Sequence, residues 1–286
     1  MKVRVITAMV CIALIFPFFW FSEPLAADHP LNYLFPALIS LLTFVSVWEL
    51  LHCVGLDKNY YISVPFYLAA PIFPMLARIM RGNYEDYLRI AVLTLLALVV
   101  YLFAVIVFQF GKLDMGRVAL AFMIAFYVIG SFSAIILLRD TPVAGRFLFL
   151  MPFVFSWVTD TFAYFCGRLF GKHKLIPTVS PKKTVEGAVG GAVFCALTAF
   201  LYGVIVNACF DVAPNYAALI LCGLAAAVVS QIGDLVMSAI KRQFELKDFG
   251  KVLPGHGGLL DRFDSSIAVT VLLLVINTYF PVFQVM

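Results

Sequence analysis

Apolar runs long enough to cross a lipid bilayer recur along the whole sequence. A helix needs about 20 such residues to span about 30 Å of hydrocarbon. The composition agrees, since 63% of the residues are hydrophobic and only 13% are charged, against about 25% in soluble domains. We therefore expect an all-α polytopic integral membrane protein with about nine transmembrane helices, at approximately 5–21, 31–51, 60–79, 87–110, 118–138, 147–165, 185–210, 216–237 and 266–286.

The third run contains three prolines, Pro65, Pro71 and Pro74. Each removes a backbone donor and kinks a helix, so this run is expected to be bent or partly re-entrant. The first run follows two basic residues, as a signal peptide would. Its apolar core is longer than a usual signal segment, and Leu25 stands where cleavage needs a small residue. We interpret the first run as a helix.

The distribution of Lys and Arg predicts the orientation, because positively charged connections stay in the cytoplasm. A cytoplasmic N-terminus places most of the 20 basic residues on the cytoplasmic side. The two most basic connections, 167–184 and 238–265, then share that side. A polyanion arriving from the cytosol would meet them first.

Two functional regions are expected. Residues 1–149 hold scaffold helices that contact lipids or a second copy of the chain, and residues 150–286 form a catalytic region with its motifs facing the cytoplasm. The six cysteines are scattered singly, which is typical of packing residues. The net charge of +4 is small and no nucleic-acid motif is present, so no nucleic-acid partner is expected.

Acidic residues near the cytoplasmic ends of two runs predict a metal site. Gln231, Asp234, Ser238 and Lys241 are spaced to share one face of a helix. Asp261 and Asp264, three residues apart, open the ninth run. If these three carboxylates converge, they need a neutralising cation, and oxygen ligands suit Mg²⁺, which is commonly bound with substrate phosphates. The alternatives are an ion pair of Asp234 with Lys241 or Arg242 and an N-cap at Asp264.

The other polar segments permit both a functional and a structural interpretation. Ser180 before Pro181 predicts a helix start whose free N–H groups, beside Lys182 and Lys183, form an anion site. The same lysines can simply hold the loop inside. In 'KVLPGHGG', glycines allow close approach to a ligand and His256 can donate to an oxygen, but an ordinary turn has the same composition. Asp160 either lines the pocket or is hydrogen-bonded between helices.

The segment 'SAIKRQFELKDFGKVLPGHGGLLDRFD', residues 238–264, resembles the signature of phosphatidate cytidylyltransferases, also called CDP-diacylglycerol synthases. The matching pattern is S-x-x-K-R, then K-D, then P-x-H-G-G-x-x-D-R-x-D. The upstream 'QIGDL' and 'SPKKTVEG' segments resemble that family in similar order and spacing. Val185 stands where an aromatic residue is more usual.

The resemblance implies that CTP and phosphatidate become CDP-diacylglycerol and pyrophosphate with Mg²⁺, in a bacterial inner membrane or an organelle membrane. It also implies a homodimer and a metal site at Asp234, Asp261 and Asp264. Two cations between the carboxylates would cancel repulsion between the polyanionic reactants. The predicted site residues are catalytic Asp234, Asp261, Asp264 and Lys241, with substrate contacts from Ser180, Lys182, Lys183, Thr184, Arg242, His256, Gly257 and Arg262.

Two other functions are compatible with parts of the sequence. Intramembrane acids also serve as ion relays in transporters, although no paired repeats with broken helices are evident here. A related nucleotidyltransferase acting on another lipid acceptor would share these motifs. The string D-G-x-x-A-R of CDP-alcohol phosphotransferases is absent from the sequence.

Overall fold

The computed structural model describes residues 30–210, 212–255 and 257–285. Within these residues, seven helices are long and apolar enough to cross a membrane, and they correspond to the second to eighth predicted runs. The chain is therefore an all-α membrane protein. The first predicted run lies outside the described residues. The ninth forms helix α10 (Leu260–Tyr279), which is not among the seven.

The described chain divides into two compact units, and each is built from two stretches of sequence. The first unit comprises Met1–Leu137 and Leu246–Arg262, and the second comprises Leu138–Glu245 and Phe263–Met286. The loop that carries most of the signature segment thus belongs to the same unit as the N-terminal helices. Helix α10 begins in the first unit and continues in the second.

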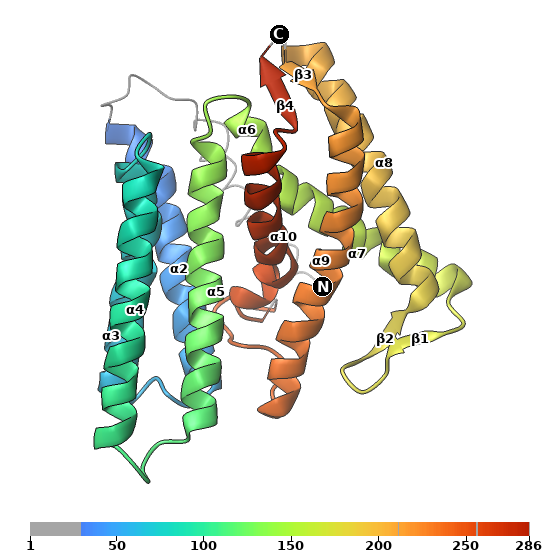
Figure 1. Ribbon diagram of the computed structural model, residues 1–286. Coiled ribbons are helices and arrows are strands. Elements are labelled where there is room, and N and C mark those ends of the chain that lie inside the picture. The colour runs from blue at the N-terminus through green and yellow to red at the C-terminus, as the bar shows by residue number, and fades with distance from the viewer. Residues whose placement is uncertain (1–29, 211, 256, 286) are drawn as a thin grey trace. The chain divides into compact units, whose positions relative to one another are not determined.

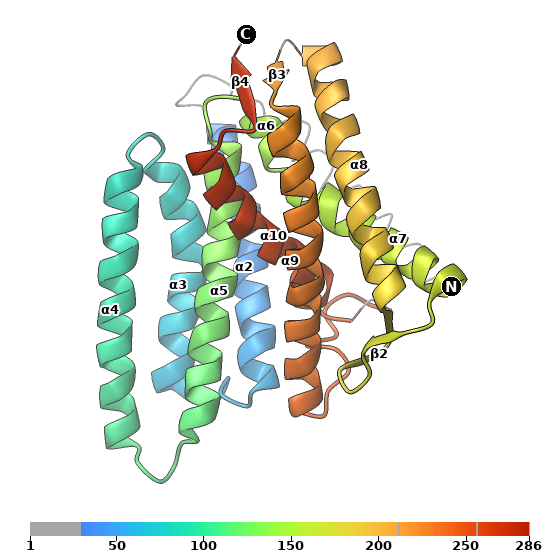
Figure 2. The same cartoon turned by 45° about the vertical axis from the view of Figure 1, so that its right-hand side comes forward.

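Four long helices form most of the first unit. A short 3₁₀ helix, η1 (Pro30–Tyr33), leads into α2 (Leu34–Cys53), followed by α3 (Tyr60–Ile79), α4 (Tyr84–Phe108) and α5 (Met115–Arg139). Helix α2 packs against α3, and α3 packs against α4. Figures 1 and 2 show these four helices lying alongside one another with short connections. Buried Leu50, Phe66 and Phe132 contribute to the core of the unit.

Helix α3 is continuous despite its three prolines. The whole run is long and apolar enough to cross a membrane, and a bent or partly re-entrant course in the bilayer stays a prediction. Prolines are tolerated in membrane helices because neighbouring groups and small backbone adjustments satisfy the carbonyls that lose a donor.

The second unit combines long helices with two small hairpins. It contains α6 (Gly145–Leu148), α7 (Met151–Phe170), β1 (Lys174–Ile176), β2 (Ser180–Thr184), α8 (Val185–Phe210), β3 (Val212–Pro214), α9 (Tyr216–Gln243), the greater part of α10, and β4 (Phe283–Val285). Strand β1 pairs antiparallel with β2, and β3 pairs antiparallel with β4. Figure 2 shows β2 leading directly into α8.

Helices α7, α8 and α9 pack closely because small residues line their contacts. A Cβ at Gly191 of α8 would lie 2.8 Å from the Thr159 carbonyl oxygen of α7, and one at Gly223 of α9 would lie 2.8 Å from Cβ of Ala199. Small side chains of this kind let helix backbones approach each other in a membrane. This packing places α7 and α9 beside α8 and holds the polar faces of the second unit in position.

The last predicted run differs from the observed helix at both ends. Helix α10 begins at Leu260, six residues before the predicted start, and ends at Tyr279, so residues 280–285 are not helical. Pro281 explains the end, because proline disfavours helical geometry in the residue before it. Residues 283–285 pair with β3 instead.

Candidate active site

A carboxylate of helix α9, Asp234, contacts polar residues of two elements of the second unit. Asp234 Oδ2 is 2.5 Å from Nζ of Lys183 on β2, and both side chains are about one-quarter exposed. One helical turn further along α9, the Ser238 hydroxyl donates to Asp234 Oδ1 at 3.3 Å. The helix and the shared face predicted for these residues are thus observed, but the basic partner of Asp234 comes from the hairpin.

The carboxylate of Asp264 is the second member of this group. It lies 3.9 Å from Nζ of Lys241 on α9, and the two side chains are 13% and 10% exposed, respectively. Because α10 starts at Leu260, Asp264 is the fifth residue of the helix. The alternative of an N-cap at Asp264 is therefore wrong, because this residue lies inside the helix and its Oδ1 accepts the N–H of the adjacent Ser265.

Asp160 of helix α7 provides a third carboxylate. Its Oδ2 accepts a hydrogen bond from the Ser265 hydroxyl of α10 at 3.2 Å. Asp160, Asp234 and Asp264 are close enough for their charges to repel one another, and Lys183 and Lys241 partly offset this repulsion. Asp160 was a secondary candidate in the sequence, and the structure connects it to the main pair. We call Asp160, Asp234 and Asp264, with Lys183 and Lys241, the carboxylate cluster.

The donor chemistry of the carboxylate cluster suits a hard cation. Carboxylate oxygens from three helices are the ligand type that Mg²⁺ prefers. Among the described residues, no three His, Cys, Asp or Glu side chains converge tightly enough to enclose one ion. The ammonium groups of Lys183 and Lys241 lie against two of the carboxylates instead. The oxygen ligands of the cluster thus suit a cation, and two lysine ammonium groups lie beside them.

Asp261 occupies a different environment within the first unit. It is 8% exposed, and its Oδ2 accepts N–H groups from Phe249 at 2.8 Å and from Gly258 at 3.0 Å. This carboxylate therefore holds Phe249 and Gly258, near the two ends of the loop that precedes α10, close to each other. Its predicted role as a metal ligand stays a prediction.

A further buried carboxylate, which the sequence interpretation missed, contacts the same loop. Glu49 lies on α2, is 0% exposed, and accepts backbone N–H groups from Leu259 and Leu260. The available signal was an acid within an otherwise apolar run, 'FVSVWELLHC'. Such acids are expensive in a membrane and are commonly functional.

The basic segment predicted to start a helix is instead a strand. Residues Ser180–Thr184 form β2, which pairs with β1, and the helix begins only at Val185. The fixed φ of Pro181 and its missing N–H suit the edge of a sheet as well as a helix start. The residue that caps α8 is Thr184, whose Oγ1 accepts the Gly187 N–H at 3.2 Å. The hairpin directs Lys183 to Asp234.

The remaining predicted residues have mixed surroundings. On β2, Lys182 is exposed and Ser180 is partly exposed. Arg242 and Arg262 are both exposed. Gly257 has φ +85°, a conformation that favours glycine, and a Cβ there would lie 3.1 Å from the Asp248 carboxyl. His256 lies outside the described residues.

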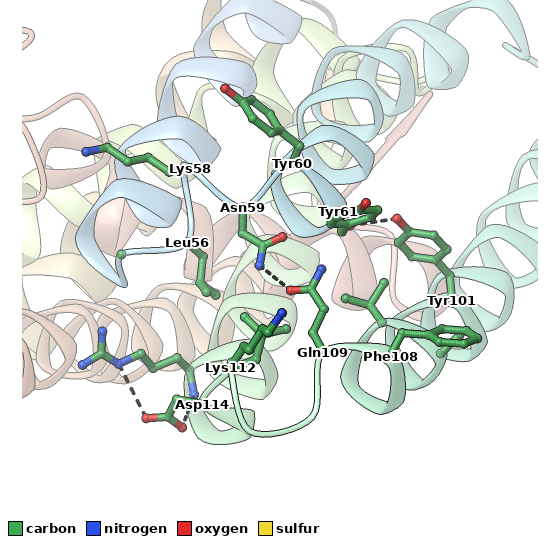
Figure 3. Close-up of a pocket in the computed structure, with 15 residues that line it drawn as sticks. Leu56, Lys58, Asn59, Tyr60, Tyr61, Tyr101, Phe108, Gln109, Lys112 and Asp114 are labelled. Carbon is green, nitrogen blue, oxygen red and sulfur yellow. Dashed lines mark hydrogen bonds and ion pairs between the residues drawn. The ribbon is translucent and has the colours of Figure 1, made fainter.

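A separate pocket occurs in the first unit, where α2 connects to α3 and α4 connects to α5 (Figure 3). It has a volume of about 1170 Å³. The residues that line it include Lys58, Lys112, Tyr101, Asn59 and Gln109. The side-chain amide of Asn59 donates a hydrogen bond to Gln109 Oε1 at 2.8 Å. The described residues that line it include none of the predicted site residues, so the predicted site does not coincide with this pocket.

A family model and several known proteins match nearly the whole chain. A model described as the cytidylyltransferase family matches residues 2–280. A phosphatidate cytidylyltransferase of Staphylococcus saprophyticus is 34% identical over 274 residues, 96% of this chain and 97% of that protein. The protein of that name from Staphylococcus haemolyticus is 34% identical over 275 residues, with the same two coverages. One from Staphylococcus aureus is 46% identical over 137 residues, 47% of this chain and 50% of that protein.

Proposed function

This chain belongs to the cytidylyltransferase family, and we propose that its chemistry takes place at the carboxylate cluster. The reaction transfers the cytidylyl group of CTP to phosphatidate and gives CDP-diacylglycerol and pyrophosphate. A phosphatidate oxygen forms a bond to the α-phosphorus of CTP, and the bond from that phosphorus to the bridging oxygen of the β-phosphate breaks. The leaving pyrophosphate carries away the electron pair.

Charge is the main obstacle to this reaction, because both reactants are polyanions. The lipid phosphate is already an anionic nucleophile, so no strong general base is needed. The protein must cancel repulsion and align the reacting oxygen with the leaving group. We propose that Lys183 and Lys241, which lie beside Asp234 and Asp264, exchange these carboxylate partners for phosphate oxygens when CTP binds. Lys182 and Arg242, both exposed, are the residues we expect to meet the outer phosphates.

We infer that Asp234 and Asp264 hold Mg²⁺, with Asp160 as a neighbouring carboxylate and Asp261 as the third predicted ligand. When bound there, one or two cations would neutralise the phosphates of CTP and the charge that develops on pyrophosphate. Asp234 of α9 and Asp264 of α10 would hold the metal beside Lys183 and Lys241. Ser180, Thr184, His256, Gly257 and Arg262 stay proposed substrate contacts.

The membrane setting supports a cytoplasm-facing site. We propose a cytoplasmic N-terminus and nine membrane helices in a bacterial inner membrane, on the basis of the basic connections and the apolar runs. Phosphatidate can then keep its acyl chains in the bilayer while its head group reaches the site, and CTP arrives from the cytosol. The proposed homodimer is supported by the family resemblance alone.

The observation that supports the proposed site is the proximity of Asp160, Asp234 and Asp264, from three different helices, with a lysine beside each of Asp234 and Asp264. Purified protein in detergent should release pyrophosphate and form CDP-diacylglycerol from CTP, phosphatidate and Mg²⁺. Asp264→Asn should abolish both products. Asp114→Asn, which changes an exposed acid of the first unit, should leave them unchanged.

Competition experiments define the substrates. The four nucleoside triphosphates and several phospholipid acceptors should be compared with the same preparation. A protein that does not prefer CTP, or that prefers another lipid acceptor to phosphatidate, would contradict the proposed reaction. Full activity in Asp264→Asn would place the chemistry elsewhere in the chain.

A further inference from the structure

A carboxylate of helix α2 holds the start of helix α10. Glu49 Oε1 accepts the Leu259 N–H and its Oε2 accepts the Leu260 N–H, both at 2.9 Å. These residues are 210 and 211 positions away from Glu49 in sequence. All three lie in the first unit. The contact therefore fixes the end of the signature loop against an N-terminal helix.

Both partners need this contact. The first N–H groups of a helix have no acceptor within the helix, and its N-terminus favours negative charge. A carboxylate that is 0% exposed is costly to bury unless its oxygens are hydrogen-bonded. Glu49 satisfies the N–H groups at the beginning of α10, and these N–H groups in turn stabilise the buried charge.

Two glycines of the loop pack directly against the same carboxylate. A Cβ at Gly250 would overlap the Glu49 side chain, and a Cβ at Gly258 would lie 2.7 Å from both carboxylate oxygens. Any larger residue at either position would push the loop away from α2. These glycines are therefore explained by close packing on Glu49, independently of any ligand.

The loop has a second anchor from its own sequence. Asp261 accepts the N–H groups of Phe249 and Gly258, which draws the two ends of the loop together. Glu49 and Asp261 thus bind four backbone N–H groups within residues 249–260. One anchor is local, and the other comes from a helix that the sequence places in the scaffold region.

We propose that Glu49 is a positioning residue for the cytidylyl transfer. It sets the residue at which α10 begins, and thereby the turn of α10 that carries Asp261 and Asp264. Both Glu49 oxygens are occupied by backbone donors and the side chain is buried, so Glu49 acts through the loop and not on the substrate. The step from loop position to catalysis rests on the proposed function.

Two substitutions at Glu49 test the proposal. Glu49→Gln has nearly the same shape but keeps only one acceptor oxygen, and Glu49→Ala removes both. Ser46→Ala is the matched control, because Ser46 is a buried polar residue on the same helix, 0% exposed, whose hydroxyl has no hydrogen-bond partner among the described residues. Hydrogen exchange of peptides covering 246–262 and steady-state kinetics with CTP are measured for each protein in detergent.

In both Glu49 variants, we expect exchange in 246–262 to accelerate about tenfold or more, as for the loss of a hydrogen bond to a charged group. Exchange in α3 and α4 should not change. The KM for CTP should rise by a similar factor, and less in Glu49→Gln than in Glu49→Ala. A purely structural defect would instead reduce the amount of active enzyme and leave the KM unchanged.

Gly250→Ala adds an independent test of the same contact. In the wild-type background its new methyl group collides with Glu49 and should raise both loop exchange and the KM for CTP. In the Glu49→Ala background the obstructing side chain is gone, so Gly250→Ala should add little. Fully additive effects would overturn the proposed contact.

The outcomes separate this proposal from the proposed function. Wild-type loop exchange and wild-type KM in Glu49→Gln would refute the positioning role, as would effects no larger than those of Ser46→Ala. If Glu49→Ala yields no folded protein, Glu49→Gln and Gly250→Ala decide. If the wild-type protein does not convert CTP and phosphatidate, the proposed function fails, while the exchange data still establish or reject the anchoring of the loop.

Discussion

Lys183 of strand β2 and Asp234 of helix α9 form an ion pair, with Nζ and Oδ2 2.5 Å apart. The hairpin of β1 and β2 thus reaches across to the polar face of α9 within the second unit. Both side chains are about one-quarter exposed, so the pair is only partly screened by solvent. This arrangement places an ammonium group beside a carboxylate that we propose binds the metal.

Removing the ammonium group of Lys183 should impair catalysis strongly. We expect Lys183→Met to lower kcat/KM for CTP by about 100-fold, a usual cost for deleting one electrostatic stabiliser from an active site. Lys183→Arg keeps the charge and should be less affected. Lys174→Met, which changes an exposed residue of β1, is the control. Equal activity of Lys183→Met and the control would exclude Lys183 from the site.

The dependence on magnesium should report on Asp264. Chelation by EDTA is expected to abolish pyrophosphate release, and added Mg²⁺ to restore it. In Asp264→Asn, residual activity should need at least about tenfold more Mg²⁺ for half-saturation, because one anionic oxygen ligand is lost. A titration of initial rate against Mg²⁺ measures this. An unchanged half-saturation concentration would indicate that Asp264 is not a ligand.

Asp160 should matter for its charge more than for its hydrogen bond. Asp160→Asn removes a carboxylate from the cluster, and we expect kcat/KM to fall about 10- to 100-fold. Ser265→Ala removes only the hydroxyl that donates to Asp160 Oδ2, and its effect should be several-fold smaller. Steady-state kinetics of the two variants at saturating Mg²⁺ compare them. A larger loss in Ser265→Ala would show that Asp160 has only a structural role.

The close approach of α7 and α8 should make Gly191 sensitive to substitution. A Cβ at this position would lie 2.8 Å from the Thr159 carbonyl oxygen, so Gly191→Ala should destabilise the protein by about 1–3 kcal/mol. A Cβ at Gly130 of α5 would meet no atom of the described residues within 4 Å, so Gly130→Ala should be neutral or slightly stabilising. Thermal unfolding in detergent measures both. The opposite order of Tm would contradict the described packing.

The membrane helices were predictable because each depends on local composition. An apolar run of about 20 residues in a bilayer has to satisfy its backbone internally, and a helix does so regardless of its neighbours. The seven described spans accordingly follow seven of the predicted runs. The shared face of Asp234 and Ser238 was predictable for the same reason, since helical periodicity alone sets it.

The local signals failed where two structures were compatible with the same residues. Ser180 and Pro181 suit a helix start, yet pairing with β1 makes this segment a strand and leaves the cap to Thr184. The start of α10 was predicted six residues late, because 'LLDRFD' is too polar to be recognised as part of an apolar run. For Ser180 the deciding partner is the neighbouring strand of the same hairpin, and for α10 it is Glu49, which lies 210 and 211 residues from the two N–H groups that it accepts.

The sequence by itself therefore determined the class of the protein and its membrane helices, because these follow from composition and periodicity, and the resemblance of residues 238–264 to a known family indicated Asp234, Asp261 and Asp264. Only the tertiary structure decided which charges meet. It joined Lys183 to Asp234, brought Asp160 to Ser265, and placed Glu49 under the beginning of α10. Such contacts depend on the relative positions of segments up to 211 residues apart, and the packing of helices, not the spacing along the chain, sets those positions.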